Sequence, residues 1–435
     1  MGIVREDYLT FQQHGAKVYQ YENSFQIRGV QMKFEDTKMT RQEIIDTVDH
    51  YMFNAGARYD LVVDHAKDMY VYDVNGEKYL DFYAGIAVNS AGNCNEKVIH
   101  AIKEQSEALI HSSNYPYSIP QAMLAKLICE TIHMDKIFFQ NSGSEANELM
   151  IKMVRKYGVE HYGPEHYHIV TAKQSFHGRT YGSLSATGQP DNGCQIGYAP
   201  VLPGFTYADF NDLNSFKDAC SENTIAIMIE PVQGEGGVYP ATEEFITGLR
   251  KFCDEKQIFL IFDEVQTGWG RCGDVMAFMT YGVKPDAVTM AKAMGGGMPI
   301  SACCASEELA SAIIPGAHGS TYGGNPVCCA ASYAAISEIL ERQLPQNAKK
   351  VGAYFMDKLQ TLPDVKEVRG RGLLVGVEFV TPIAMKVKHD CLEQHLLITA
   401  VSEHTIRIVP PLILTEADCD QAVEILNNVV QGILG

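Results

Sequence analysis

The sequence lacks any hydrophobic run long enough to cross a membrane, which takes about 18 to 20 consecutive apolar residues. Its N-terminal stretch, MGIVREDYLTFQQHGAKVYQ, contains no apolar segment of the kind found in secretory signals. Glu6 stands where an N-terminal lipidation signal has serine or threonine. From these absences we expect a cytoplasmic protein without a membrane span.

Basic residues are scarce relative to acidic ones, with 35 Lys and Arg against 53 Asp and Glu and a formal net charge of -18. Nucleic acids and anionic membrane surfaces attract basic faces, so neither is expected as a partner. The glycine-rich stretches also form neither the dinucleotide fingerprint nor a P-loop. Composition and motifs therefore argue against several common classes of binding protein.

Recognisable metal and disulfide spacings are missing too. The twelve cysteines, which include adjacent pairs at 303–304 and 328–329, sit mostly in apolar runs. We expect them to pack in the core of a protein from a reducing compartment. His161, His166 and His168 gather in EHYGPEHYH without a metal-site spacing, and we expect a loop there rather than a metal centre.

The chain is long enough for more than one domain, since it has 435 residues of which 46% are hydrophobic and 20% charged. Residues 1–40 show no periodicity and are predicted to be an extension that packs on the body or contacts a partner subunit. We expect residues 41–96 to begin a small domain, 97–330 to form a large domain and 331–435 to complete the small one.

Local signals support this division. Thr40 and Glu43 form a capping box, and the apolar residues that follow at helical spacing predict a helix. Those apolar residues are Ile44, Ile45, Val48 and Met52. The dipeptide Asn75-Gly76 between two alternating runs predicts a hairpin.

The middle of the chain alternates between short apolar strands and helical segments such as SEANELMIKMVRKYG, which predicts an α/β fold with a mostly parallel sheet. The predicted strands are KIFFQ, HIVTA, TIAIMIEP, IFLIFDE and AVTMAK. Near the C-terminus, strand-like GLLVGVEFV and IRIVPPLI precede a helix that Thr415 and Asp418 open. Its predicted inward residues are Val423, Leu426, Val429 and Val430, so a smaller α+β domain is expected.

Asp263 and Lys292 each follow an apolar strand, which places them at the sheet edge where α/β proteins bind ligands. This pair suits pyridoxal phosphate, since an amine can hold that cofactor as a Schiff base and a carboxylate can keep its pyridine nitrogen protonated. A lysine in a dry pocket can also shuttle protons. The alternatives are that Asp263 caps a turn and that Lys292 is an exposed residue at a strand end.

Two glycine-containing segments suit a phosphate group. Gly143 and Ser144 open a helix, where backbone N–H groups and the helix dipole attract anions. Ser320 and Thr321 in GSTYGGNP can add hydroxyl groups to the same anion. Taken singly, the first segment is equally consistent with a helix cap and the second with a tight loop.

Aromatic and basic residues complete a hypothetical site. Phe176 can lie flat on a cofactor ring and Val265 can pack on its opposite face, although both residues also suit a core. Arg179 can clamp a carboxylate in bidentate fashion, or form a surface salt bridge. Glu235 and Arg407 both belong to segments near strand ends, and an arginine that alternates between an acid and a substrate carboxylate would let one pocket accept two substrates.

Six segments, taken together and in order, resemble the class III aminotransferases of pyridoxal phosphate fold type I. They are NSGSEANE, SFHGRT, EPVQGEGG, FDEVQTG, MAKAMGGGMPI and HGSTYGGNP, and the resemblance runs from about residue 58 to the C-terminus. It implies a large domain with a mostly parallel seven-stranded sheet flanked by helices, a smaller α+β domain built from both ends of the chain, pyridoxal 5'-phosphate as cofactor, and a homodimer.

Within that class, YLDFYAGIAVNS, SNYPYS and FHGRT look most like acetylornithine and ornithine aminotransferases. By this resemblance, Lys292 binds the cofactor aldehyde, Asp263 contacts the pyridine nitrogen and Gln266 contacts the ring hydroxyl. Glu235 and Arg407 match the acid and the arginine whose pairing changes with the bound substrate. Further cofactor residues by resemblance are Ser142, Gly143, Ser144, Phe176, Glu230, Val265 and, from the neighbouring subunit, Thr321. Arg179 and Ser320 are implied substrate contacts.

The resemblance implies transfer of the terminal amino group of an ω-amino acid such as N2-acetyl-L-ornithine to 2-oxoglutarate. Another amine on the same scaffold, such as ornithine or 4-aminobutyrate, and a non-catalytic cofactor-binding protein are the alternatives. Asn93, Asn95 and Glu96 in GNCNE depart from the Gly-His-x-His-Pro of the family, and residues 1–57 have no counterpart, which leaves the substrate open.

Overall fold

The computed structural model describes residues 5–10, 17–22, 37–56, 58–191 and 193–435, of which side chains are described from residue 37 onward. The chain forms two compact units, Met1–His65 with Tyr72–Glu77, and Ala66–Val71 with Lys78–Gly435. Strands β3 (Val63–Lys67) and β4 (Tyr70–Asp73) each contribute residues to both units. The predicted domain boundaries near residues 40, 96 and 330 stay a prediction.

The first unit contains a helix and a turn that the sequence predicted and a strand pair that it did not. The predicted helix is α2 (Arg41–Tyr51), and its capping box of Thr40 and Glu43 is confirmed. Strands β1 (Arg5–Thr10) and β2 (Lys17–Glu22) form an antiparallel pair within the segment expected to be an extension. Asn75 and Gly76 occupy the predicted turn, in which Gly76 N–H donates to Asp73 O at 3.0 Å.

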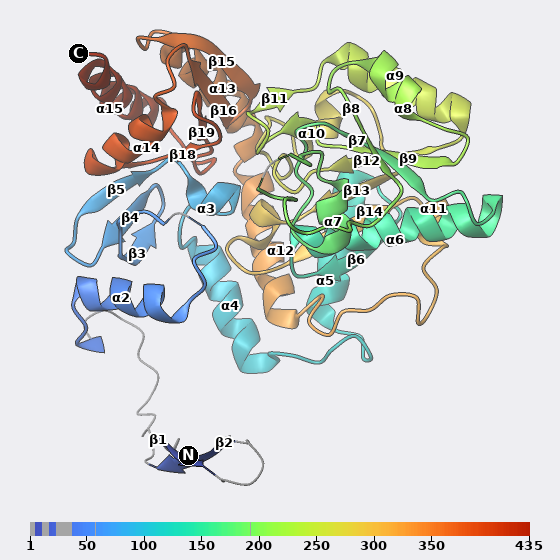
Figure 1. Cartoon of the computed structure of the whole chain (residues 1–435), viewed down its shortest axis with the longest axis horizontal. Coiled ribbons are helices and arrows are strands. Elements are labelled where there is room, and N and C mark those ends of the chain that lie inside the picture. Colours follow the sequence, from blue (N-terminus) through green and yellow to red (C-terminus); the bar gives the residue numbers. More distant parts are fainter. Residues whose placement is uncertain (1–4, 11–16, 23–36, 57, 192) are drawn as a thin grey trace. The chain divides into compact units, whose positions relative to one another are not determined.

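The second unit is built on a seven-stranded sheet in the order β6-β14-β13-β12-β9-β7-β8 (Figure 1). Strand β14 is antiparallel to both of its neighbours, β6 and β13, and the other pairs are parallel, so the prediction of a mostly parallel sheet is confirmed. The strands are β6 (Lys136–Gln140), β7 (His168–Ala172), β8 (Phe205–Ala208), β9 (Thr224–Ile229), β12 (Phe259–Asp263), β13 (Ala287–Met290) and β14 (Ser301–Ala305).

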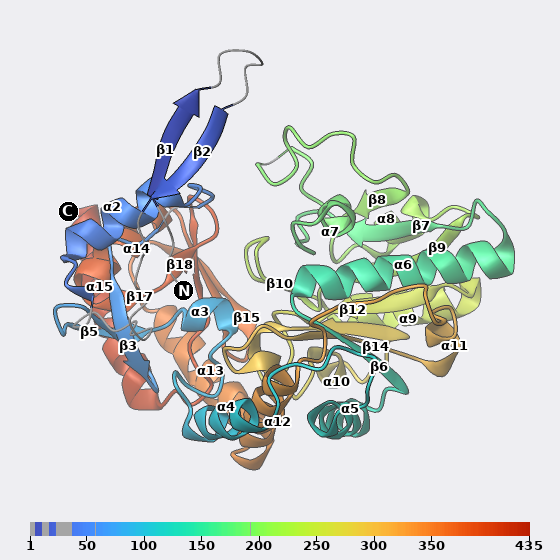
Figure 2. The same cartoon turned by 90° about the horizontal axis from the view of Figure 1, so that it is seen from below.

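Helices cover both faces of this sheet because successive strand residues point to opposite sides. Ile261 belongs to the core cluster that includes helix α6 (Gly143–Tyr162), whereas its neighbours Leu260 and Phe262 belong to the cluster that includes α5 (Ile119–Ile132). Figure 2 shows α6 on one side of the strands and α5 on the other. Other helices of this part are α9 (Glu243–Lys256), α10 (Ala277–Thr280), α11 (Glu307–Ala310) and α12 (Pro326–Glu341).

The C-terminal part contains a four-stranded sheet in the order β15-β16-β19-β18. Helix α15 (Glu416–Leu434) begins with the predicted capping box of Thr415 and Asp418, and three of its four predicted inward residues are buried. The other elements are β15 (Val365–Arg371), β16 (Leu374–Phe379), β18 (Thr399–Ala400), β19 (Thr405–Ile408), α13 (Leu344–Leu359) and α14 (Ala384–Glu393).

The residues that depart from the family pattern have local structural roles. Asn95 caps helix α4 (Glu96–Ala108) by accepting hydrogen bonds from the amides of Lys97 and Val98. Buried Asn93 donates to Asp81 Oδ2 at 2.8 Å.

The remaining elements are β5 (Lys78–Asp81), α3 (Ala84–Ala87), α7 (Tyr181–Ala186), α8 (Leu213–Ala219), β10 (Val232–Gln233), β11 (Tyr239–Pro240), η1 (Lys292–Gly295) and β17 (Leu396–Leu397).

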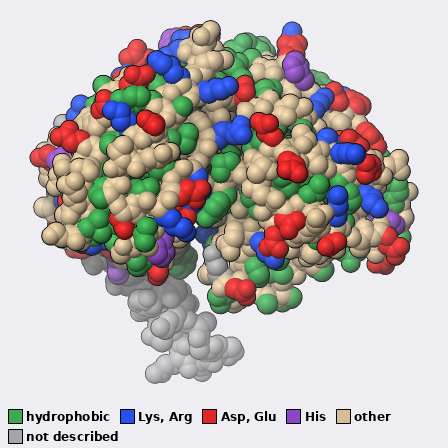
Figure 3. Space-filling model, turned by 90° about the horizontal axis from the view of Figure 1, so that it is seen from above, with side chains coloured by type: hydrophobic (Ala, Val, Ile, Leu, Met, Phe, Trp, Pro, Cys, Tyr) green, Lys and Arg blue, Asp and Glu red, His purple; other side chains and the backbone are tan. Residues whose placement is uncertain are grey.

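All twelve cysteines are free and eight of them are buried, so the prediction that they pack in the core is confirmed for those eight. On the face shown in Figure 3, acidic and basic side chains are intermingled rather than gathered by sign. Within the described residues, none of the helices has the length and apolar character needed to span a bilayer.

The capping box of α15 gives a test of local stability. Thr415→Ala removes the hydroxyl that accepts from Asp418 N at 3.3 Å, and we expect the free energy of unfolding to fall by about 1 kcal/mol. Chemical denaturation of the variant and the wild type measures the difference. Thr247→Ala, an exposed position inside α9, is the control and should change stability by less than about 0.5 kcal/mol. Equal losses in both variants would contradict a capping role.

Candidate functional site

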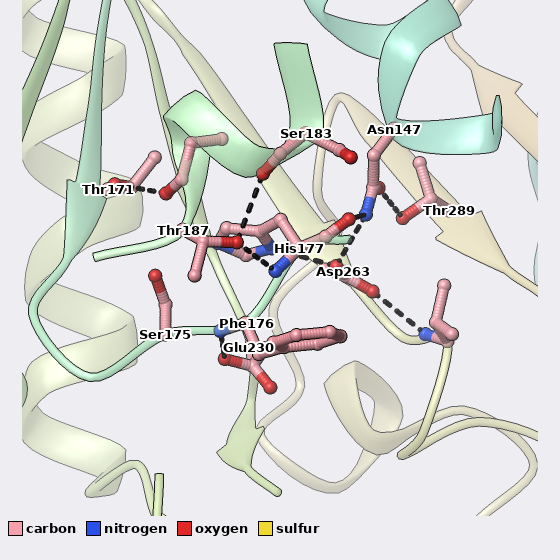
Figure 4. A network of polar contacts seen from close by, with 12 residues as sticks. Asn147, Thr171, Ser175, Phe176, His177, Ser183, Thr187, Glu230, Asp263 and Thr289 are labelled. Atoms are coloured by element: carbon pink, nitrogen blue, oxygen red, sulfur yellow. Dashed lines mark hydrogen bonds and ion pairs between the residues drawn. The ribbon is translucent and has the colours of Figure 1, made fainter. Parts of the chain in front are cut away.

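The carboxylate of Asp263 is held at the end of β12, a fully buried apolar strand. Its Oδ2 atom accepts hydrogen bonds from Asn147 Nδ2 and His177 Nδ1, both at 2.8 Å, and its Oδ1 atom accepts from the amide of Val265 at 3.0 Å. Figure 4 shows the carboxylate between Asn147 and His177. Three donors from different segments therefore fix its orientation.

His177 and Asn147 are candidate functional residues because both bind Asp263, and neither was predicted from the sequence. Burial alone would lower the pKa of His177, but the hydrogen bond and the charge of Asp263 outweigh it and raise that pKa. The charge of Asp263 and the hydrogen bond from His177 thus favour the protonated imidazole more than burial alone would allow. Asn147 is itself oriented, since it donates to His177 O at 2.6 Å and accepts from Thr289 Oγ1 at 2.7 Å.

Asn147 lies in the motif NSGSEANE and His177 in SFHGRT, so the sequence places both residues beside predicted cofactor residues. Asn147 follows Gly143 by four positions on α6, which puts the two residues on the same helical face. His177 directly follows Phe176 in SFHGRT. Neither position reveals by itself that the side chains converge on Asp263.

Lys292 begins η1, just beyond the end of β13. Its φ of +44° is unusual for a residue with a side chain and marks a constrained backbone. The pKa of Lys292 is lowered because burial disfavours the ammonium ion, an effect that the negative charge of Glu235 opposes only in part. A larger fraction of this amine is therefore neutral and nucleophilic than in water.

A cavity of about 380 Å³ joins these groups. Seven of the predicted cofactor residues line it, namely Ser142, Gly143, Ser144, Phe176, Asp263, Val265 and Lys292. Its other lining residues are Val88, Asn141, Asn147, His177, Gly178, Ala291, Gly297, Met298, Pro299 and Ile300. The structure thus brings together an amine, a carboxylate and an aromatic ring that are far apart in the sequence.

One end of the cavity is suited to an anion. Helix α6 begins there, with Ser142 as the N-cap and Gly143 and Ser144 in its first turn. A Cβ atom at Gly143 would lie only 2.8 Å from Val265 Cγ1, so glycine allows the helix start and Val265 to approach closely. Backbone amides at the start of a long helix attract phosphate.

These residues fit the pyridoxal phosphate that the sequence predicts. The α6 start can receive its phosphate, the Phe176 and Val265 side chains offer apolar surfaces for its ring, and the Asp263 carboxylate, hydrogen-bonded to His177 Nδ1, suits a protonated pyridine nitrogen. Lys292 supplies an amine of lowered pKa in the same cavity.

The predicted acid and arginine are also in contact. Arg407 Nη1 forms an ion pair with Glu235 Oε1, and the Arg407 side chain is only 3% exposed. Burial opposes ionisation of Glu235, but the charge and hydrogen bond of Arg407 outweigh it and lower the pKa of Glu235. Gln266 accepts from Arg407 Nη1 at 3.3 Å and donates to Glu235 Oε1 at 3.4 Å, so in this structure its amide lies against the pair.

Glu230 and Arg179 do not line the cavity but both contact Phe176, which does, and their predicted roles stay predictions. Glu230 is buried and its carboxylate accepts from the amides of Phe176 at 3.0 Å and Gly234 at 3.3 Å. Burial raises the pKa of Glu230 to about 7. Arg179 is exposed, and its guanidinium lies 5.2 Å from the centre of the Phe176 ring.

The two hydroxyl residues of GSTYGGNP lie outside the cavity lining. Ser320 Oγ accepts from Asn141 Nδ2 at 3.4 Å, and Asn141 lines the cavity, so Ser320 is one residue away from it. Thr321 is exposed on the surface of this chain. The roles of Ser320 and Thr321 at the site stay predictions.

Beside Asp263, the buried carboxyl of Glu264 gives a pH test. Burial raises the pKa of Glu264 to about 7, although it accepts hydrogen bonds from the amides of Ala277 and Phe278. Between the usual carboxyl range near pH 4.3 and about pH 7 the folded protein keeps this proton while the unfolded chain releases it. The stability contributed by this group should therefore fall as pH rises through that interval and level off above it.

Unfolding measured from pH 4 to 8 checks this prediction. The free energy of unfolding of the wild type should decline relative to that of Glu264→Gln over the interval and then run parallel to it. Glu255→Gln, which removes an exposed acid from α9, should leave the wild-type pH dependence unchanged. Parallel curves for the wild type and Glu264→Gln throughout would refute the raised pKa.

Known proteins are similar to this chain in sequence and in fold. The family model described as aminotransferase class-III matches residues 52–430. The acetylornithine aminotransferase of Caldanaerobacter subterraneus subsp. tengcongensis is 45% identical over 387 residues, which cover 88% of this chain and 98% of that protein. That of Methanocaldococcus jannaschii is 45% identical over 395 residues, covering 90% and 98%.

A solved structure extends the likeness to three dimensions. The ornithine aminotransferase of Toxoplasma gondii, crystallised with oxidised glutathione, superposes with a TM-score of 0.86 at 30% identity, covering 90% of this chain and 94% of that one. That structure shows pyridoxal phosphate at partial occupancy in its active site.

Proposed function

The chain belongs to the class-III aminotransferase family, and on that basis we propose that it transfers the terminal amino group of N2-acetyl-L-ornithine to 2-oxoglutarate. The products are a semialdehyde and L-glutamate. The enzyme is a transaminase that uses pyridoxal 5'-phosphate. The observation that carries the proposal is the cavity shared by Lys292 and Asp263, with the Glu235–Arg407 pair close enough for both of its charges to act on Lys292.

The cofactor residues divide by the part of the molecule that they would hold. Gly143 and Ser144 would bind the phosphate, Phe176 and Val265 would enclose the ring, and Lys292 would bind the aldehyde. When bound, pyridoxal phosphate supplies an electron sink and carries the amino group from one substrate to the next.

Lys292 is the residue that moves protons. Its lowered pKa leaves the amine able to accept the proton from the substrate carbon that bears the amino group. The charges of Glu235 and Asp263 stabilise the ammonium form that results, so Nζ can return the proton at a second carbon. This alternation requires both protonation states of the amine; burial favours the neutral one, and the charges of Glu235 and Asp263 favour the ammonium ion.

Asp263 is held at the buried end of β12 by side chains from two other segments. The hydrogen bonds from His177 and Asn147 stabilise the carboxylate and hold it in one orientation. An ionised and oriented Asp263 is able to keep a proton on a bound pyridine nitrogen. His177 and Asn147 act as positioning residues through Asp263.

Substrate choice is proposed to depend on Arg407. With the amine-bearing substrate bound, Arg407 stays paired with Glu235, and with a five-carbon diacid bound it pairs with a substrate carboxylate instead. Arg179, exposed beside Phe176, binds the carboxylate that both substrates share. Ser320 contributes a further hydroxyl contact.

Ornithine is the second candidate donor. The ion pair between Glu235 and Arg407 favours it, because the α-amino group of ornithine is a cation that an ionised Glu235 attracts. The acetylated donor has no such cation. A comparison of the activities with ornithine and N2-acetyl-L-ornithine therefore tests whether Glu235 attracts the α-amino group.

The enzyme is proposed to work as a homodimer in the cytoplasm, with Ser320 and Thr321 reaching the neighbouring active site. The support is an apolar cavity of about 650 Å³ between α4, α5 and α12, whose lining includes Leu109, Tyr117, Ile119 and Met123. All four side chains are exposed in the isolated chain. Apolar surface of this extent on a soluble protein commonly marks a subunit interface.

Donor profiling tests the proposed reaction. Purified enzyme with 2-oxoglutarate should form glutamate from N2-acetyl-L-ornithine faster than from ornithine or 4-aminobutyrate. Lys292→Ala should lose on the order of 10⁴-fold or more in turnover because it removes both the amine and the proton carrier. Lys284→Ala, which changes an exposed lysine between α10 and β13, should retain activity. Absence of glutamate with every ω-amino acid would end the proposal.

Subunit mixing tests the dimer. Lys292→Ala and Thr321→Asp subunits should each be inactive alone, the second because a carboxylate repels the cofactor phosphate. If Thr321 serves the neighbouring site, a hybrid dimer has one site with both native residues, and mixing followed by reassociation restores activity. A mixture that stays as inactive as its parents, although hybrids are shown by mass spectrometry, would place Thr321 in its own subunit's site.

A further inference from the structure

Four residues form one row across the C-terminal sheet. Arg369 on β15 is paired with Gly376 on β16, Gly376 with Arg407 on β19, and Arg407 with Thr399 on β18. The two arginines are therefore two strands apart on the same line, with a glycine between them. Thr399 Oγ1 accepts from Arg407 Nε at 3.3 Å, which steadies one end of the row.

The two arginines hold the same loop. Residues 234–238 connect β10 to β11, and this loop carries Glu235, the ion-pair partner of Arg407. Arg369 Nε donates to Gly237 O at 2.9 Å, and its guanidinium lies 4.0 Å from the centre of the Tyr239 ring. Figure 1 shows β11 beside β15. One arginine thus binds the acid of the loop and the other binds its backbone two residues later.

The loop adopts a backbone conformation that needs such support. Val238 has a φ of +60°, a conformation that β-branched residues strongly disfavour, and its side chain is fully buried. Strain of this kind persists only where surrounding contacts impose it, and it is concentrated at functional sites.

Gly376 makes room for this arrangement. A Cβ atom at position 376 would lie 2.9 Å from Val238 Cβ and 3.3 Å from Gly237 O. Any larger residue in the middle of the row would therefore push the loop away from the sheet. The absence of a side chain at Gly376 lets Val238 pack there while Arg369 and Arg407 hold the loop on either side.

Arg369 is itself held in place. Its side chain is only 6% exposed, and its Nη1 atom forms ion pairs with Glu378 and Glu367. Glu378 is also paired with Lys366 at 2.6 Å, so that acid keeps a cationic partner without Arg369. The Arg369 contact with Gly237 O comes from a preorganised guanidinium rather than from a mobile surface side chain.

We propose that Arg369 and Gly376 are positioning residues that place Glu235 against Arg407, and that they thereby determine which end of the substrate reacts. This inference rests on the proposed function, since it concerns the choice between a terminal amine and glutamate. With Glu235 in place, Arg407 is screened and the α-carboxylate of an amino donor is not drawn to it. With the loop released, Arg407 is free for that carboxylate and the terminal amine is presented less often.

Half-reactions of Arg369→Met holoenzyme test the proposal. The absorbance change of the bound cofactor follows each substrate separately, with N2-acetyl-L-ornithine or ornithine as terminal-amine donor and glutamate as α-amine donor. We expect kcat/KM for the terminal-amine donor to fall on the order of 10- to 100-fold, the cost of misplacing one group by about an ångström. The value for glutamate should stay within about twofold of the wild type, or rise.

Two further variants separate positioning from general stability. Lys366→Met removes the other cation on Glu378 without touching the loop, and it should change neither half-reaction. In a Glu235→Gln background, Arg369→Met should add little, because a residue that acts through Glu235 has nothing left to position. If Arg369→Met does not fold, Arg369→Lys keeps the charge beside Glu378 but loses the Nε donor, and it should show the same selectivity change.

The possible outcomes are distinct. Equal losses in both half-reactions, or full additivity with Glu235→Gln, would overturn the positioning role and leave Arg369 a structural residue. A wild-type enzyme that reacts with glutamate but with no terminal-amine donor would instead overturn the proposed function. A selective loss for the terminal amine, in enzyme with wild-type cofactor content, supports the inference.

Discussion

The hydrogen-bonded contact between Asp263 and His177 is the interaction on which the site depends. A carboxylate at the end of a fully buried strand is costly unless it is paired, and the imidazole supplies the partner while Asn147 supplies the second donor. Together with the hydrogen bond from Asn147, this contact ties three segments together, the end of β12, the first turns of α6 and the loop that carries Phe176. The start of α6, the loop that holds the Phe176 ring and the Asp263 carboxylate are thereby fixed relative to one another.

The ion pair that is proposed to distinguish substrates is built differently from this hydrogen-bonded centre. Glu235 lies on a short loop with a disfavoured backbone conformation at Val238, held between two arginines of one sheet row. In the proposed function, Arg407 exchanges Glu235 for a substrate carboxylate, which requires two arrangements of this ion pair. That proposal places the chemistry at the edge of the large sheet and the selectivity where the β10–β11 loop meets the C-terminal sheet.

Much of this could be predicted from local sequence signals, each with a physical cause. Capping boxes at Thr40 and Thr415 were identified correctly because caps depend on residues three positions apart. Apolar strands such as β12 were identified because their runs are continuous. Strand β14, made of Ser, Ala and Cys, gave no such signal, and β1 and β2 lack the periodicity that would reveal them. The convergence of His177 and Asn147 on Asp263 could not be found, because contacts across 86 and 116 positions leave no trace in local pattern.

The sequence by itself determined the family and the cofactor, and it predicted which amine and acid serve that cofactor, because these follow from residue types in motifs that are local in the chain. Tertiary structure alone decided what surrounds them: that an imidazole is hydrogen-bonded to Asp263, that Gln266 lies against Glu235 and Arg407, and that Arg369 shares a row with Arg407. The physical reason is that pairing, burial and register arise from the approach of distant segments. Those are the quantities that set the pKa of Lys292 and the position of Glu235.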